Sequence, residues 1–134
     1  MIYLLDTHYV LWSLFDPAKI AGPVRQILEN DTDNKLISGV NLWEISFKYS
    51  LGRLELGGTD PSEILDTLLQ AGFEVAELES RLLATYHQLP KKDDHRDPFD
   101  RLLIWQAISN DYTLLTHDRK IEQYQADGLR LVVS

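Results

Sequence analysis

Four acidic residues are placed where they could act together: Asp6, Glu44, Asp100 and Asp118. Three of them follow predicted strands, and the fourth lies near the start of a predicted helix. In open parallel sheets, ligands bind beyond the carboxyl ends of the strands. Carboxylate oxygens without cysteine or clustered histidine partners suit hard cations, so we expect Mg²⁺ or Mn²⁺ there. Such ions can activate water for attack on a phosphodiester without a nucleophilic side chain.

Each acid also has an ordinary structural role to weigh against this prediction. An aspartate that follows a strand is often the N-cap of the next helix, and Asp6 and Asp118 could each be one. Glu44 stands four residues before Lys48, which is the spacing of an ion pair on a helix surface. Asp100 is near a helix start, where the helix dipole favours an acid. If the four acids converge at one edge of the sheet, the cation site is favoured, because acids that only cap separate helices have no reason to lie close together.

Other catalytic chemistries find little support. The chain has no cysteine, which excludes disulfides, cysteine-based zinc sites and thiol nucleophiles. It has no nucleophile elbow around a serine and no Walker-type glycine loop. A receiver-type phosphotransfer module needs adjacent acids after the first strand, and Asp6 has none beside it. The histidines show no metal-binding spacing, so we interpret each as a surface or capping residue: His8, His87, His95 and His117.

Length and composition predict one soluble domain over residues 1–134. The net charge of −8 argues against a broad basic face for nucleic acid. No segment approaches the roughly 20 apolar residues of a membrane helix. The N-terminus lacks the features of a signal peptide, so we expect a cytoplasmic protein.

The elements that must position the acids alternate along the chain. Predicted strands cover 2–5, 35–38, 112–116 and 129–133, with a short one possible at 73–75. Predicted helices cover 7–15, a segment from residue 23, 41–51, 62–71, 80–88 and 98–109, and a charged loop covers 90–96. Strands without charges on either face indicate a sheet that is covered on both sides. The expected class is α/β, with a mostly parallel sheet of about five strands.

Three blocks of sequence, with a fourth short one, resemble the PIN-domain ribonucleases, and in particular the VapC-type toxins. Residues 2–8 are similar to their opening strand and first catalytic aspartate, and residues 38–56 (SGVNLWEISFKYSLGRLEL) to a block that carries their acidic Glu. Residues 95–107 (HRDPFDRLLIWQA) resemble their third acidic block, and residues 115–118 their last acidic strand end. Trp105 departs from the pattern, because a small residue is usual there.

The resemblance implies a PIN-like, Rossmann-like α/β/α sandwich that acts as a metal-dependent endoribonuclease. It implies the toxin of a type II toxin–antitoxin pair, a homodimer, and an antitoxin that inserts a segment into the acidic site. Within this frame Asp100 is the third ligand and Asp97 an outer-shell acid, although Asp97 stays open as the alternative ligand. Thr7 and Thr116 are expected to orient the carboxylates or the water.

RNA contacts should come from cations around an acidic site, since the acids themselves repel phosphate. The candidates lie beside the second and third blocks: Lys48, Arg53, Lys92, Arg96 and Arg101. Each could equally be part of a solvated surface.

The alternative function is a catalytically inactive PIN-fold module that binds RNA or protein.

Overall fold

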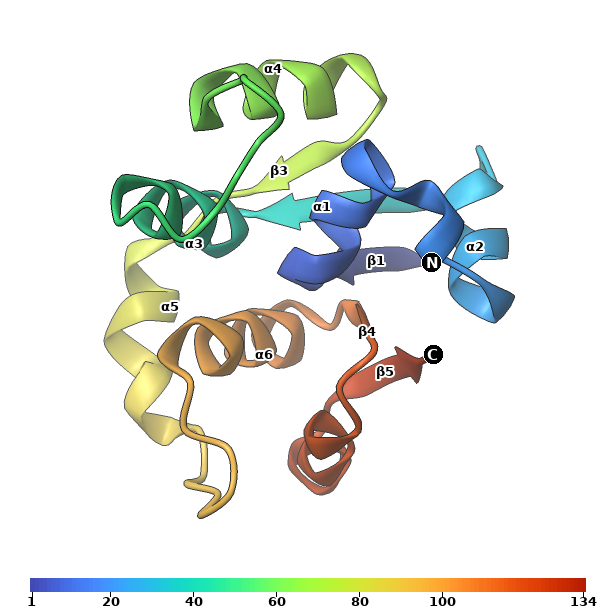
Figure 1. Ribbon diagram of the computed structural model, residues 1–134. Coiled ribbons are helices and arrows are strands. Elements are labelled where there is room, and N and C mark those ends of the chain that lie inside the picture. Colours follow the sequence, from blue (N-terminus) through green and yellow to red (C-terminus); the bar gives the residue numbers. More distant parts are fainter.

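Five short strands form one parallel sheet in the order β3-β2-β1-β4-β5. The computed structural model describes every residue from 1 to 134. Figure 1 shows β3 and β5 toward opposite ends of the molecule, with α4 beside β3. The prediction of an α/β fold with about five mostly parallel strands is confirmed. The bounds are β1 (Ile2–Leu5), β2 (Asn34–Ser38), β3 (Glu74–Ala76), β4 (Thr113–Thr116) and β5 (Arg130–Val133).

Six α-helices and three 3₁₀ helices connect the strands. The predicted helix over 7–15 has these bounds in the structure, whereas the one predicted over 80–88 is divided into α5 and a 3₁₀ turn. The segment after Asp118 is a 3₁₀ helix. The helices are α1 (Thr7–Phe15), α2 (Gly22–Glu29), α3 (Gly39–Ser50), α4 (Pro61–Gln70), α5 (Ser80–Thr85) and α6 (Pro98–Asn110), and the 3₁₀ helices are η1 (Pro17–Lys19), η2 (Tyr86–Gln88) and η3 (Arg119–Asp127).

Alternating strand residues face two separate cores, which makes the molecule a three-layer sandwich. Leu4 and Leu114 are fully buried in a core with residues of α6 and η3. Leu5 and Leu115 are fully buried in the other core with residues of α1, α2, α3 and α4. Because successive side chains of a strand point to opposite faces, apolar runs of this kind are covered on both sides.

The strand order reverses at β1, which lies between β2 and β4. Leu5 pairs with Leu115 in register, and the next amide, that of Asp6, donates to the Leu115 carbonyl over 3.0 Å. The segments after β1 and β4 therefore leave the sheet side by side. This crevice is the topological switch point where open parallel sheets bind ligands.

Helix α6 is tied to the rest of the sandwich by polar side chains as well as by its apolar face. The Gln106 side chain is buried; it accepts from the Ser38 hydroxyl and donates to the Ala76 carbonyl. Trp105 donates from Nε1 to the carbonyl of Leu82, within α5, over 3.2 Å. The large side chain that departs from the family pattern is thus accommodated between α6 and α5.

No helix here is both long enough and apolar enough to cross a membrane.

Candidate active site

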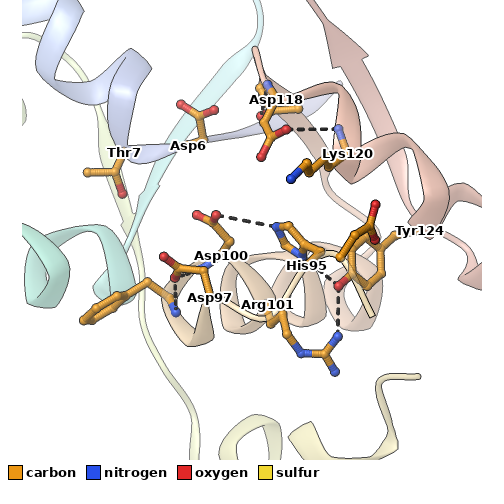
Figure 2. Close-up of polar contacts among 12 residues, drawn as sticks. Asp6, Thr7, His95, Asp97, Asp100, Arg101, Asp118, Lys120 and Tyr124 are labelled. Atoms are coloured by element: carbon orange, nitrogen blue, oxygen red, sulfur yellow. Dashed lines mark hydrogen bonds and ion pairs between the residues drawn. The ribbon is translucent and has the colours of Figure 1, made fainter. Parts of the chain in front are cut away.

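All four predicted acids line one hollow at the switch point, with a volume of about 320 Å³. The three predicted supporting residues line it as well, and so does Lys48. Figure 2 shows Asp6, Asp100 and Asp118 arriving from different elements around a common space. The expected convergence at one edge of the sheet is therefore present. The lining residues are Asp6, Thr7, His8, Glu44, Lys48, Asp97, Asp100, Thr116, His117, Asp118, Arg119 and Ile121.

Asp6 and Asp118 cap helices and line the hollow at the same time. Asp6 Oδ1 accepts from the Tyr9 amide at the start of α1 over 3.0 Å. Asp118 Oδ1 accepts from the Lys120 amide at the start of η3 over 3.0 Å, as Figure 2 shows. Each cap uses one oxygen. Asp118 Oδ2 has no hydrogen-bond partner, whereas Asp6 Oδ2 also accepts from the His117 amide over 3.4 Å and faces the hollow beside that residue. The two roles that the sequence left as alternatives are compatible.

Glu44 is 7% exposed, and both of its carboxylate oxygens have partners. The Thr7 hydroxyl donates to Oε1 over 2.6 Å, and Lys48 Nζ pairs with Oε2 at 2.5 Å. Asn41 donates to the Thr7 hydroxyl over 3.0 Å, which fixes the direction of that hydroxyl. The four-residue pairing with Lys48 does form, but it holds a buried acid of the hollow rather than a surface residue.

Asp100 is the carboxylate with the fewest partners. It lies in the first turn of α6, where Asp97 is the N-cap and accepts from the amides of Phe99 and Asp100. Burial, followed by the charges of the neighbouring acids Asp97, Glu44, Asp6 and Asp118, raises the pKa of Asp100 to about 7. Like charges this close disfavour the ionised form unless a cation joins them.

Thr116 supports the last acid through the backbone. Its hydroxyl is fully buried and accepts from the Asp118 amide over 3.1 Å. Thr7 and Thr116 therefore each hold one of the predicted acids, Thr7 directly and Thr116 through the main chain. Their predicted orienting roles fit this placement.

Three histidines belong to the site, and the sequence interpretation gave none of them a place there: His8 and His117 line the hollow, and His95 lies beside Asp100. His117 Nδ1 lies 3.5 Å from Asp6 Oδ2, and hydrogen bonding to Asp6 raises the pKa of His117. His95 is 5% exposed, so its interpretation as a surface or capping residue is wrong; burial lowers its pKa. The signal that could have found them is their spacing to acids, since His117 directly precedes Asp118 and His95 precedes Asp97 by two.

The predicted RNA-binding cations are placed in four different ways. Lys48 lines the hollow, whereas Arg53 follows α3 and is exposed outside it. Lys92 pairs with Asp127 at 2.9 Å. Arg96 is exposed and Arg101 is 8% exposed, with its guanidinium directed inward.

The donor set of the hollow fits a divalent cation. The carboxylates contribute hard oxygen atoms, and one of them has a pKa that its acidic neighbours raise. No cysteine is present, and the ring nitrogens of three histidines lie within 4.8 Å of acidic oxygens: those of His8 and His117 near Asp6, and that of His95 near Asp100 and Asp118. Mg²⁺ and Mn²⁺ prefer oxygen ligands of this kind.

Comparisons with known proteins agree with this architecture. The family model described as "PIN domain" matches residues 3–127. Ribonuclease VapC22 of Mycobacterium tuberculosis is 25% identical over 124 residues, which cover 91% of each chain.

Solved structures show the same fold. A chain of VapBC2 from Rickettsia felis, bound to a fragment of promoter DNA, superposes with a TM-score of 0.73 at 20% identity, covering 99% of this chain and 98% of that one. A chain of VapBC-1 from nontypeable Haemophilus influenzae gives a TM-score of 0.68 at 21% identity, with the same coverage. With four acids in one hollow and the family model over nearly its full length, the chain belongs to the PIN domain family, and within that family it is similar to VapC proteins.

Proposed function

We propose that the protein is a Mg²⁺- or Mn²⁺-dependent endoribonuclease and the toxin of a toxin–antitoxin pair. The observation that carries the proposal is the gathering of Asp6, Glu44, Asp100 and Asp118 in one hollow. The raised pKa of Asp100 supports it, because a cluster short of positive charge favours a divalent cation. The ribonuclease name of the Mycobacterium relative supports the substrate class.

In this proposal the four acids hold the cation, and the other residues of the hollow hold the acids. A bound Mg²⁺ or Mn²⁺ would lower the pKa of a water molecule and stabilise the charge that develops on the phosphodiester. Thr7 and Lys48 keep the Glu44 carboxylate in place. Asp97 caps the start of α6, where it accepts from the Asp100 amide, and thereby directs Asp100 into the hollow. This role places Asp97 outside the set of direct ligands of the cation. Asp97 as a direct ligand is the alternative within the same proposal.

We expect Asp6→Asn to reduce RNA cleavage by at least about 100-fold, since an amide lacks the charge that holds the cation. Purified protein is incubated with structured RNAs and Mg²⁺ or Mn²⁺, with EDTA as a second control. The matched variant is Asp66→Asn, an exposed acid of α4 outside the hollow, which should cleave as the wild type does. Cleavage that survives both Asp6→Asn and EDTA would contradict the mechanism, and no cleavage of any RNA would favour the inactive binding module.

A second prediction concerns stability and pH. In the metal-free protein the folded state keeps the Asp100 proton to about pH 7. The unfolded chain releases this proton near pH 4, so the free energy of unfolding falls as the pH rises between these values. Asp100→Asn should therefore raise the melting temperature of the metal-free protein at pH 8 relative to wild type, and less so at pH 5.

The same melting experiments test the cation. A free cation at 100 times its Kd adds about 2.7 kcal/mol, which corresponds to a rise of several degrees for wild type at pH 8. The rise should shrink at pH 5 and disappear in Asp100→Asn, while Asp66→Asn should follow the wild type. Equal metal-induced shifts in wild type and Asp100→Asn would exclude Asp100 as a ligand.

RNA is proposed to reach the hollow over a cationic surface that adjoins it. A second hollow of about 490 Å³ includes Lys91, Lys92, Arg96 and His95 in its lining. Arg96 is exposed there, held only by a bond from Nε to the Asp93 carbonyl over 3.1 Å. Arg101 is left out of the RNA contacts because its guanidinium is buried, and Lys92 is a weaker choice because of its ion pair. Arg53 stays in the proposal, and Lys48 stays because it lines the acidic hollow itself, although its Nζ also pairs with Glu44.

Arg96→Ala should weaken RNA binding and reduce the slope of log affinity against log salt by about 0.7, the value for one phosphate contact on a single strand. Binding is measured in an Asp118→Asn background, so that the RNA stays intact. Arg25→Ala, which removes an exposed cation from α2, is the matched control and should leave the slope unchanged. A slope that is the same in Arg96→Ala and in its parent would remove Arg96 from the RNA path.

The antitoxin is proposed to bind an exposed aromatic surface next to the acids. Trp43 and Phe47 of α3 are 54% and 44% exposed. Their rings lie 4.8 and 5.9 Å from the Phe99 ring at the start of α6. Exposed apolar clusters of this kind mark protein interaction sites. The solved VapBC structures pair such chains with a second protein, which supports an antitoxin as the partner.

We expect Trp43→Ser to weaken the complex with the protein encoded by the adjacent reading frame by at least about 10-fold, because a large buried aromatic is a typical interface anchor. The two proteins are co-expressed and the Kd is measured with purified partners. Phe15→Ser, which removes an exposed aromatic at the end of α1, should bind as the wild type does. Light scattering on the free protein should give the mass of the proposed homodimer. Equal Kd values for Trp43→Ser and wild type would rule out this surface.

A further inference from the structure

A buried row of polar side chains lies directly behind Asp100. Arg101 donates from Nη1 to the Tyr124 hydroxyl over 2.9 Å, and the same hydroxyl lies 2.8 Å from His95 Nδ1. The other ring nitrogen, His95 Nε2, lies 3.6 Å from Asp100 Oδ2. Figure 2 shows the four side chains in this order, leading from the interior to the acidic hollow. Tyr124 is fully buried, and His95 and Arg101 are 5% and 8% exposed.

The donors of this row determine the direction of its hydrogen bonds. Arginine has only donors, so the Tyr124 oxygen accepts from Arg101. The Tyr124 proton then has one acceptor within reach, which is His95 Nδ1. A neutral imidazole that accepts at Nδ1 carries its proton on Nε2. The row therefore presents an N–H group toward Asp100, on a buried nitrogen that has no hydrogen-bond partner and lies 3.6 Å from Asp100 Oδ2.

The opposite tautomer fits the surroundings poorly. With the proton on Nδ1, the Tyr124 oxygen would accept from both His95 and Arg101, and its own buried proton would have no acceptor. The Nε2 lone pair would then face the oxygen of Asp100 without a proton between them. That arrangement would suit His95 only as a direct metal ligand, together with Asp100 and Asp118, whose ligand atoms lie within 4.8 Å of Nε2.

Arg101 also holds the segment that carries His95. Its guanidinium donates to the carbonyls of Leu89 and Pro90, each over 3.1 Å, and to the Tyr86 hydroxyl over 3.1 Å. No carboxylate pairs with it. A buried cation of this kind is retained only where its hydrogen bonds are satisfied, and here they join α6 to the loop before it.

We propose that His95 is a positioning residue of the metal site: it directs Nε2–H toward Asp100 Oδ2, 3.6 Å away, and Tyr124 and Arg101 set its tautomer and ring orientation. This inference rests on the proposed function for the role of Asp100. Its consequence is that Asp100 presents its other oxygen to the cation. Outer residues that orient a ligand in this way typically contribute about 10- to 100-fold in metal affinity.

The tautomer is measured directly on the metal-free protein. Long-range proton–nitrogen correlation spectra of ¹⁵N-histidine-labelled protein distinguish the two tautomers, and His95→Gln identifies the His95 signals. We expect the Nε2–H form in wild type and a shift toward the Nδ1–H form in Tyr124→Phe, which keeps the buried ring and removes the hydroxyl. Tyr86→Phe is the matched control, because it removes the other hydroxyl bonded to Arg101 without touching His95. A predominant Nδ1–H form in wild type would overturn the proposal in favour of a direct ligand.

Manganese titration by calorimetry gives the second measurement. We expect Tyr124→Phe and His95→Leu to weaken Mn²⁺ binding by about 10-fold or more. His95→Gln should recover part of this loss, because its amide N–H can stand near the position of Nε2, and Tyr86→Phe should bind as the wild type does. Equal Mn²⁺ affinity in His95→Leu, His95→Gln and wild type would overturn the proposal. If even the wild type binds no Mn²⁺, the proposed function fails, and the wild-type tautomer still decides the hydrogen-bond direction.

Discussion

Repulsion among carboxylates at the carboxyl edge of the sheet is the constraint on which the site depends. The parallel register of β1 and β4 brings the segments after these strands together, and the starts of α3 and α6 add two more acids. Burial and, after it, the resulting excess of negative charge raise the pKa of Asp100. Lys48 and His117 offset part of it from the rim. A divalent cation would offset the rest, which ties metal binding to the stability of the fold.

Helix capping stabilises three of these acidic side chains in the folded protein. Asp6, Asp97 and Asp118 each accept from amides at the start of a helical segment, where a negative charge is favoured. These bonds stabilise the fold and also set the direction of the side chains. The capping and ligand roles therefore share one geometry, and a substitution at Asp6 or Asp118 is expected to affect both. Asp100 has no capping role, so its placement depends more on the groups packed behind it.

The distribution of charge matters more here than its sum. A chain with a net charge of −8 can still bind RNA if its cations are grouped beside the site. Lys91 and Arg96 are exposed around an adjoining hollow, whereas Arg101, which also lines it, is buried and directs its guanidinium inward. Two neighbouring cations of one charged block thus have different roles. The inward one satisfies carbonyls and hydroxyls and holds the loop that bears His95.

The sequence alone was sufficient to predict the α/β class, the strand-end acids and the family, because strand and helix periodicities are local and Asp6, Glu44, Asp100 and Asp118 each lie within a recognisable block. It predicted the hollow only through the rule that parallel strands end at the same edge. Tertiary structure alone decided that Asp6 and Asp118 can cap helices and also line the hollow, because the hollow is formed by segments that lie far apart in the chain. It also decided that His95 is buried behind Asp100 and that Arg101 is directed to Tyr124, which lies 23 residues away in sequence. Such side-chain directions depend on packing between α6 and η3, which no local pattern records.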